Sequence, residues 1–121
     1  MILGGLNDTK ANRTAVQMET DYGSILDALA AAKVFPTAIG ILPFSGSAWS
    51  APRETVRVTF NAWSHDEPRL RAGRGRFVSL ETRLGDGASP PALQEAYDIS
   101  DGEHPSAEGA RVIGRCIGSR F

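Results

Sequence analysis

Residues 53–63, RETVRVTFNAW, decide the fold class. Their apolar side chains fit either a strand or a helix, and the two choices lead to different folds. Val56, Val58 and Phe60 alternate with polar residues, as they would along a half-buried strand. Val56, Phe60 and Trp63 instead fall on one face of a helix. The segment by itself is compatible with both elements, so the neighbouring sequence must decide between them.

Two apolar runs flank this segment, and both are typical of buried strands. Residues 37–43, TAIGILP, end at a proline, and residues 76–80, RFVSL, follow a stretch rich in arginine and glycine. If the two strands are parallel, the chain between them must cross over the sheet, and a helix is the usual crossover. We therefore predict a helix over residues 53–63 and a parallel sheet.

The rest of the chain extends this alternation. Residues 1–4, MILG, are typical of the end of a buried strand, and a polar loop follows. A helix is predicted from Thr14 to Lys33, because Thr14 and Gln17 have the spacing of a capping box and a cation suits the last turn. A last helix is predicted from Ser106, a residue type that N-caps favour. The apolar faces of the two helices are formed by Met18, Tyr22, Ile25, Leu26 and Leu29, and by Val112, Ile113, Cys116 and Ile117.

This order, β-α-β-α-β-α, indicates one α/β domain with a parallel sheet and helices on its faces. A long loop, residues 84–103, precedes the last helix, with one helical turn predicted at residues 92–97, ALQEAY. In such sheets ligands bind beyond the C-terminal ends of the strands. We expect two loops at that edge: GLND at residues 5–8 and DGEH at residues 101–104.

The composition excludes several classes of function. The formal net charge is −1 and the 13 basic residues are scattered, so no nucleic-acid or membrane-binding surface is indicated. The single cysteine cannot form an internal disulfide, and one cysteine with two histidines is too few for a structural zinc site. No cofactor is predicted, and no apolar run is long enough to span a bilayer. Four arginines among glycines are predicted to lie in a solvated loop: Arg69, Arg71, Arg74 and Arg76.

His104 carries the first chemical signal. Asp101 precedes it by three residues, and Gly102 allows a tight turn between them. A carboxylate at that separation can accept a hydrogen bond from the imidazole Nδ1–H, which leaves Nε2 free to take a proton from a nucleophile. The alternative is a surface histidine that caps a helix, with Asp101 as an ordinary turn residue.

Asn7 carries the second signal. It follows a pair of glycines at a strand end, so its side-chain amide can point into the ligand crevice. An amide at that place can donate to a developing oxyanion. The alternative is that Asn7 and Asp8 only form an Asx-type turn.

Together, the two loops resemble blocks of the SGNH/GDSL hydrolase family. The third block of that family reads G-x-N-D, matched by GLND at residues 5–8, and its fifth block reads D-x-x-H, matched by DGEH at residues 101–104. The sequence AYDISDGEHPSAEGARVIG is similar to the family's approach to the histidine and its last helix, and FNAW before RFVSLE is similar to the family's segment there. The resemblance covers essentially the whole chain.

The resemblance implies a flavodoxin-like, three-layer α/β/α fold and the hydrolysis of acyl esters. His104 would be the general base, and Asp101 would orient it. Asn7 would be one of three oxyanion donors, and Gly5 would let the strand end turn without a side chain in the pocket. The implied substrate is a small acyl ester, such as an acetylated carbohydrate or a short-chain or lipid ester.

The departure from the family is large. Its first block, G-D-S, holds the nucleophilic serine, its second block supplies a glycine donor, and no G-D-S occurs in these 121 residues. We therefore expect residues 1–121 to be the C-terminal part of a single hydrolase domain, a partial domain with about three of the family's five strands. We expect this chain alone to be inactive, and the exposed edge of its first strand to favour self-association.

Other residues are poor replacements for the missing serine. Three serines follow the strand at residues 37–43, and they are predicted to shape a pocket rim: Ser45, Ser47 and Ser50. Cys116 is assigned to the buried face of the last helix, and His65 with Asp66 to the end of a helix. Two alternatives stay open: a non-catalytic remnant or binding module of the same fold, and an unrelated α/β binding domain in which both motifs are coincidental.

Overall fold

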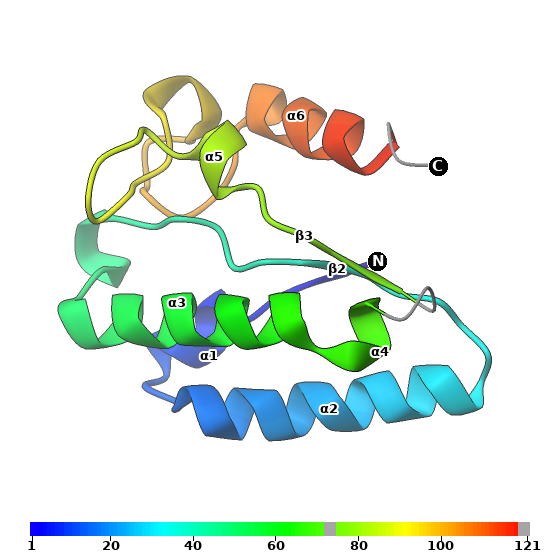
Figure 1. Ribbon diagram of the computed structural model, residues 1–121. Helices are drawn as coiled ribbons and strands as arrows, with labels where there is room; N and C mark the ends of the chain where they lie inside the picture. Colours follow the sequence, from blue (N-terminus) through cyan, green and yellow to red (C-terminus); the bar gives the residue numbers. More distant parts are fainter. Residues whose placement is uncertain (72–74, 119–121) are drawn as a thin grey trace. The chain divides into compact units, whose positions relative to one another are not determined.

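The computed structural model describes residues 1–71 and 75–118 (Figure 1). The chain divides into two units. Unit 1 is Met1–Ile41 with Ala51–Ser79, and unit 2 is Leu42–Ser50 with Leu80–Phe121. Unit 1 holds the sheet and its crossover helices, and unit 2 holds the DGEH loop and the last helix.

Unit 1 is built on a three-stranded parallel sheet in the order β1-β2-β3. Its strands are β1 (Ile2–Leu3), β2 (Thr37–Ile39) and β3 (Arg76–Val78). The α/β class with a parallel sheet of about three strands is therefore confirmed. The strands are shorter than the predicted ones; β2 stops before Pro43 because the backbone of Ile41 bonds a side chain instead of a strand.

Residues 53–63 lie within α3 (Ala51–Asp66), so the predicted crossover helix is confirmed. α2 (Ala15–Ala31) is the crossover between β1 and β2, and α4 (Pro68–Arg71) follows α3. Right-handed crossovers in a sheet whose strands follow chain order put the connecting helices on one face. α2 and α3 accordingly lie side by side along one face of the sheet in Figure 1.

The predicted capping box begins α2. Thr14 Oγ1 accepts the N–H of Gln17 at 3.2 Å, and the Gln17 side chain accepts the N–H of Thr14 at 2.9 Å. The predicted end of the helix is wrong: α2 ends at Ala31, and Lys33 lies beyond it with a φ of 57°. Because a left-handed residue ends a helix, Lys33 helps to terminate α2 and does not occupy its last turn.

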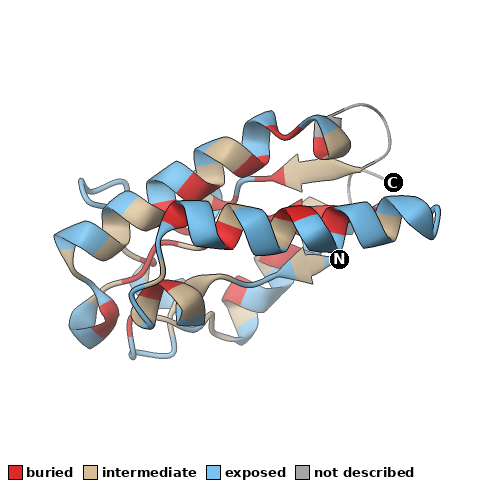
Figure 2. Ribbon diagram, turned by 90° about the horizontal axis from the view of Figure 1, so that it is seen from below, coloured by how far each residue is buried: buried red, intermediate tan, exposed pale blue. Residues whose placement is uncertain are grey.

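Two apolar clusters lie in the core of the part of unit 1 that the structure describes. Met18, Ile41 and Phe60 form one cluster, and Leu26, Ala38 and Leu70 form the other. Tyr22 and Trp63 pack against both, and their rings meet edge to face with centroids 6.2 Å apart. Figure 2 shows buried positions recurring along α2 and α3, whose other positions are intermediate or exposed.

One edge of β1 has no strand beside it within residues 1–71 and 75–118. Leu3 on β1 and Ile25 on α2 are each 47% exposed. A hollow of about 270 Å³ between β1 and α2 is lined by Ile2 and Ile25, among others. The buried face predicted for α2 is therefore wrong at Ile25, which faces this hollow.

The arginine cluster is not the solvated loop that the sequence predicts. Arg69, on α4, donates to the Glu67 carboxylate at 2.7 Å and to a carbonyl and a carboxylate of α2. Arg76 lies in β3, and Arg71 ends α4, whereas Arg74 lies outside the described residues. Since a guanidinium offers five donors, Arg69 can join α4 to α2 in this way.

Unit 2 consists of loops and short helical elements. They are η1 (Gly46–Ala48), α5 (Glu81–Leu84), η2 (Glu95–Tyr97) and α6 (Ala107–Gly118). The helical turn predicted within residues 92–97 is η2, whereas α5 was not predicted. Residues 84–103 otherwise form the predicted long loop.

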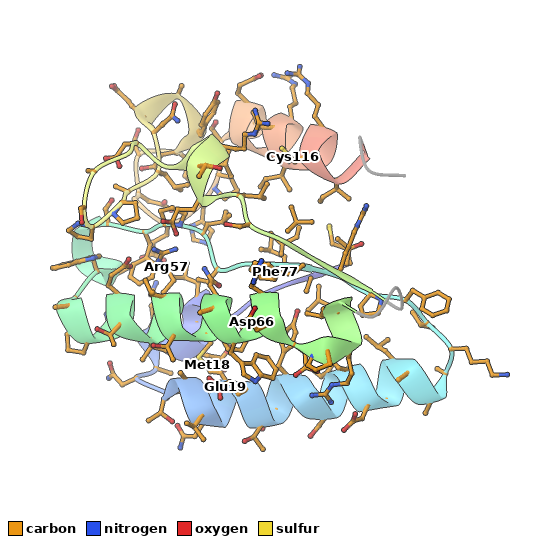
Figure 3. The ribbon with its side chains drawn as sticks, viewed as in Figure 1. Met18, Glu19, Arg57, Asp66, Phe77 and Cys116 are labelled. Carbon is orange, nitrogen blue, oxygen red and sulfur yellow. The ribbon has the colours of Figure 1, made fainter. Side chains whose placement is uncertain are left out.

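The predicted N-cap of α6 is present. Ser106 Oγ accepts the N–H of Gly109 at 3.2 Å and donates to the carbonyl of Ala96 at 2.8 Å. On the apolar face of this helix Ile113 is buried, whereas Cys116, labelled in Figure 3, is only half-buried. Cys116 is therefore not the fully packed core residue that the sequence predicts.

Candidate active site

In the DGEH loop of unit 2, the Asp101 carboxylate makes three hydrogen bonds, two of them to His104. Asp101 Oδ2 lies 2.7 Å from His104 Nδ1. The other carboxylate oxygen, Oδ1, accepts the backbone N–H of Glu103 at 2.8 Å and that of His104 at 2.9 Å. One carboxylate therefore fixes both the backbone turn and the imidazole ring.

These hydrogen bonds lower the pKa of Asp101 to about 2, with the His104 side chain as the largest cause and the two backbone N–H groups next. Asp101 is thus an acceptor at neutral pH, and the bond assigns the proton of the neutral ring to Nδ1. No described residue bonds Nε2, and the His104 side chain is 63% exposed. The imidazole can therefore accept a proton at Nε2 while Asp101 holds its other nitrogen.

Asp98 shapes the backbone of this loop. Its carboxylate accepts the N–H of Asp101 at 3.3 Å and that of Gly102 at 3.0 Å. Gly102 has a φ of 77°, which a residue with a side chain rarely adopts. Asp98 was not predicted from the sequence; the signal for it is an acid shortly before a glycine, the pattern of an Asx-type turn.

Gly5 lies in unit 1, where β1 turns into α1 (Leu6–Lys10), and it has a φ of 107°. A Cβ at this position would lie 2.7 Å from Cδ1 of Ile41. The positive φ and the close approach of Ile41 therefore require glycine at this turn. The polar loop predicted here is wrong, because the Gly5 carbonyl accepts both the N–H and the hydroxyl of Thr9 and so closes a helical turn.

Asn7 lies in the first turn of α1 and is exposed. Its side chain makes no hydrogen bond with any residue that the structure describes. Asn7 and Asp8 lie in the first turn of α1 and do not form the Asx-type turn that was considered, and Asp8 pairs with Arg13 at 3.0 Å. The Asn7 amide is accordingly available to a ligand.

The structure brings together the members of each pair. Asp101 and His104 share unit 2, and Gly5 and Asn7 share unit 1. The second histidine, His65, lies with Asp66 at the C-terminal end of α3, as predicted, and its Nδ1 is 2.9 Å from Asp66 Oδ1.

The serines of the loop after β2 also have defined places. Ser45 lines a cavity of unit 2, which agrees with its predicted place at a pocket rim, and Ser47 lies in η1. Ser50 directly precedes α3. Within the described residues no cluster of three His, Cys, Asp or Glu side chains is arranged to hold a metal ion. The helices of that part of the chain are also too short or too polar to span a bilayer.

No family profile matches the sequence. Among solved structures, the chain is similar to a candidate acylhydrolase from Bacteroides fragilis, with a TM-score of 0.79, 22% identity, and coverage of 97% of this chain and 57% of that chain. It is also similar to a GDSL-like lipase from Bacteroides thetaiotaomicron, with a TM-score of 0.78, 20% identity, and coverage of 97% and 58%. The chain therefore has an SGNH/GDSL hydrolase-like fold and spans less than three fifths of either structure.

Proposed function

We propose that residues 1–121 are the C-terminal part of a single-domain ester hydrolase of the SGNH/GDSL type. The observation that carries the proposal is the hydrogen-bonded pair of Asp101 and His104 in a chain with this fold. The likeness to a candidate acylhydrolase and to a GDSL-like lipase supports the same class of reaction. The serine nucleophile would belong to sequence outside these 121 residues.

His104 is the general base of this reaction. Its Nε2 takes the proton of the serine hydroxyl as the serine oxygen attacks the ester carbonyl carbon, and later gives it to the departing alcohol oxygen. A water molecule then releases the acyl group by the same proton transfers. Asp101 keeps Nδ1 protonated and stabilises the imidazolium that forms, and its low pKa keeps it ionised throughout.

Asn7 is one of the oxyanion donors, and Gly5 positions it. The Asn7 side-chain amide supports this role, because it makes no hydrogen bond with any described residue. Its N–H groups can therefore donate to the substrate. Gly5 supports the role of Asn7, because it allows β1 to turn directly into α1. A side chain at position 5 would collide with Ile41. The substrate is a small acyl ester, such as an acetylated carbohydrate or a short-chain ester.

The test compares two forms of the protein on a chromogenic acetyl ester. The 121-residue chain should hydrolyse it no faster than buffer, because nucleophile and part of the oxyanion site are missing. A longer form that carries the sequence encoded before Met1 should be active. His104→Ala should lower its kcat by roughly 10³-fold or more, because removing a triad member has an effect of this size. His65→Ala, which also breaks an exposed His–Asp pair, is the matched control; equal rates for wild type and His104→Ala would contradict the proposal.

The absence of G-D-S from these residues favours a second candidate, a non-catalytic remnant or binding module of the same fold. The DNA before the Met1 codon separates the two. An in-frame strand followed by G-D-S supports the hydrolase. A stop codon directly upstream supports the remnant.

A further inference from the structure

A shallow cavity of about 230 Å³ opens in unit 2. Two chain segments form its walls: Ser45, Gly46 and Trp49 come from the loop after β2, and Pro90, Pro91 and Ala92 from the long loop before α6. Neither the pair Asp101 and His104 nor the pair Gly5 and Asn7 lines it, and the proposed mechanism assigns it no role.

This cavity is joined directly to the loop of the histidine. The N–H of Ser45 donates to the carbonyl of Gly102 at 2.8 Å. A Cβ on Gly102 would lie 2.6 Å from Ser45 Oγ, and one on Gly46 would lie 3.6 Å from the carbonyl of Asp101. Ser45 and Gly46 of the cavity wall therefore lie directly against Asp101 and Gly102 of the DGEH turn. A group that fills the cavity is consequently close to the turn that carries His104.

The chemistry of the lining defines what it can bind. No lining side chain carries a charge, and the polar groups of these side chains are the Ser45 hydroxyl and the Trp49 indole N–H. Trp49 is 37% exposed although it is a large aromatic residue, and two proline rings lie at the same cavity. When an apolar group of a ligand packs against aromatic and proline rings, both surfaces are removed from water, and this stabilises the bound state.

We propose that this cavity binds the acyl chain of the ester substrate and that Trp49 supplies much of the apolar surface that covers the chain. The proposal rests on the hydrolase function, since it names the substrate of that site. A sugar ring would bring several hydroxyl groups that the two polar groups of the lining could not satisfy. The volume is below the ~300–1,000 Å³ of clefts for drug-sized ligands, so the chain is short.

The test uses the 121-residue chain and neutral amides, which reproduce an acyl group without being hydrolysed. Acetamide, butanamide and hexanamide are titrated while the ¹H–¹⁵N spectrum is recorded. The indole N–H of Trp49 and the amides of Ser45 and Ala92 should shift, and the indole N–H of Trp63 should not. Kd should tighten about two- to four-fold for each added methylene, as expected for partial to full burial of that group.

Two substitutions locate the binding. Trp49→Ala should weaken hexanamide binding at least ten-fold, and Ala92→Leu, which keeps Trp49 and fills the cavity, should weaken it as well. Ile99→Ala is the control, because Ile99 is also an exposed apolar residue of unit 2, at 57%. Methyl glucoside is titrated as a polar probe.

The proposal is overturned if the amides bind without dependence on chain length, if the shifts lie away from Trp49, or if methyl glucoside shifts these peaks and hexanamide does not. Such a result leaves the roles of His104 and Asp101 intact, because those are measured by hydrolysis. Conversely, unchanged hydrolysis after His104→Ala removes the hydrolase function while the measured amide binding stands.

Discussion

The side chain of Asn61 bonds both backbone polar groups of Ile41. Oδ1 accepts the N–H at 2.8 Å, and Nδ2 donates to the carbonyl at 2.9 Å. Ile41 is 3% exposed, so neither group has ready access to water. Arg57, which Figure 3 shows on α3, adds a longer bond of 3.4 Å to the same carbonyl. Helix α3 thus replaces a neighbouring strand where β2 leaves the sheet.

Replacing Asn61 with alanine should destabilise the protein by about 1–3 kcal/mol, because it leaves a buried N–H without an acceptor. Asn61→Asp should also destabilise it, since a carboxylate oxygen would face the Ile41 carbonyl. Urea unfolding followed by circular dichroism measures both. Thr59→Ala, an exposed change on the same helix, should stay within about 0.5 kcal/mol of wild type. Equal midpoints for Asn61→Ala and Thr59→Ala would contradict the role of Asn61.

Gly5→Ala should destabilise the protein by about 1–3 kcal/mol, because the residue has a φ of 107° and its Cβ would lie 2.7 Å from Ile41 Cδ1. Gly4→Ala is the matched control. A Cβ on Gly4 meets no atom within 4 Å, so this change should be close to neutral. Thermal melting of the two variants compares them directly, and similar melting temperatures would show that the turn tolerates a side chain.

The order of the three strands and the long helices α2, α3 and α6 could be predicted, because apolar residues recur along these segments with a strand or helix period. The apolar residues of α3 fit a strand as well, and only the need for a crossover between parallel strands made the helix the better prediction. Strand ends could not be predicted, because Asn61, 20 residues from Ile41 in sequence, determines where β2 stops pairing. α1 was missed because its closing contacts, from Thr9 to the Gly5 carbonyl, depend on a backbone conformation that only the glycine permits.

The pairing of Asp101 with His104 could be predicted because it is local, three residues apart in sequence. Its support by Asp98 was not predicted, and neither was the contact of Ser45 with Gly102, which joins loops 57 positions apart in the chain numbering. Arg69 was placed in a solvated loop because its partners on α2 are distant in sequence. Contacts between residues that are distant in sequence form only in the folded chain, so local sequence patterns do not predict them.

The open edge of β1 should cause self-association. Met1 and Leu3 are 76% and 47% exposed there, and an apolar edge can pair with a second chain. Size-exclusion chromatography with light scattering should give a mean mass that rises with protein concentration. Leu3→Lys should lower that mass, because a charged residue at an edge opposes pairing, whereas Val58→Lys on α3, where Val58 is 50% exposed, should not. A monomer with a sharp, high melting temperature at all concentrations would contradict both self-association and the partial-domain assignment.

Asp101 should stay ionised to unusually low pH. Its pKa is lowered from 3.8 to about 2 in the folded chain, chiefly by His104, so folding favours the carboxylate over the acid. The contribution of Asp101 to the stability of its loop is therefore complete above about pH 4 and is lost as pH falls towards 2. The backbone amides of Glu103 and His104, followed by NMR against pH, should move with a midpoint near 2. A midpoint near the ordinary value would mean that the carboxylate does not hold the loop.

The variant Asp101→Asn separates the two tasks of this carboxylate. The amide oxygen can still accept from the backbone of Glu103 and His104, so the turn should persist. The amide nitrogen, however, would face Nδ1 of His104 as a donor, which favours the tautomer with its proton on Nε2 and removes the base. We expect amide shifts of the loop close to wild type, with ¹⁵N shifts of the imidazole that report the exchanged tautomer. Asp66→Asn beside His65 is the control, and an unchanged His104 tautomer would show that Asp101 does not orient the ring.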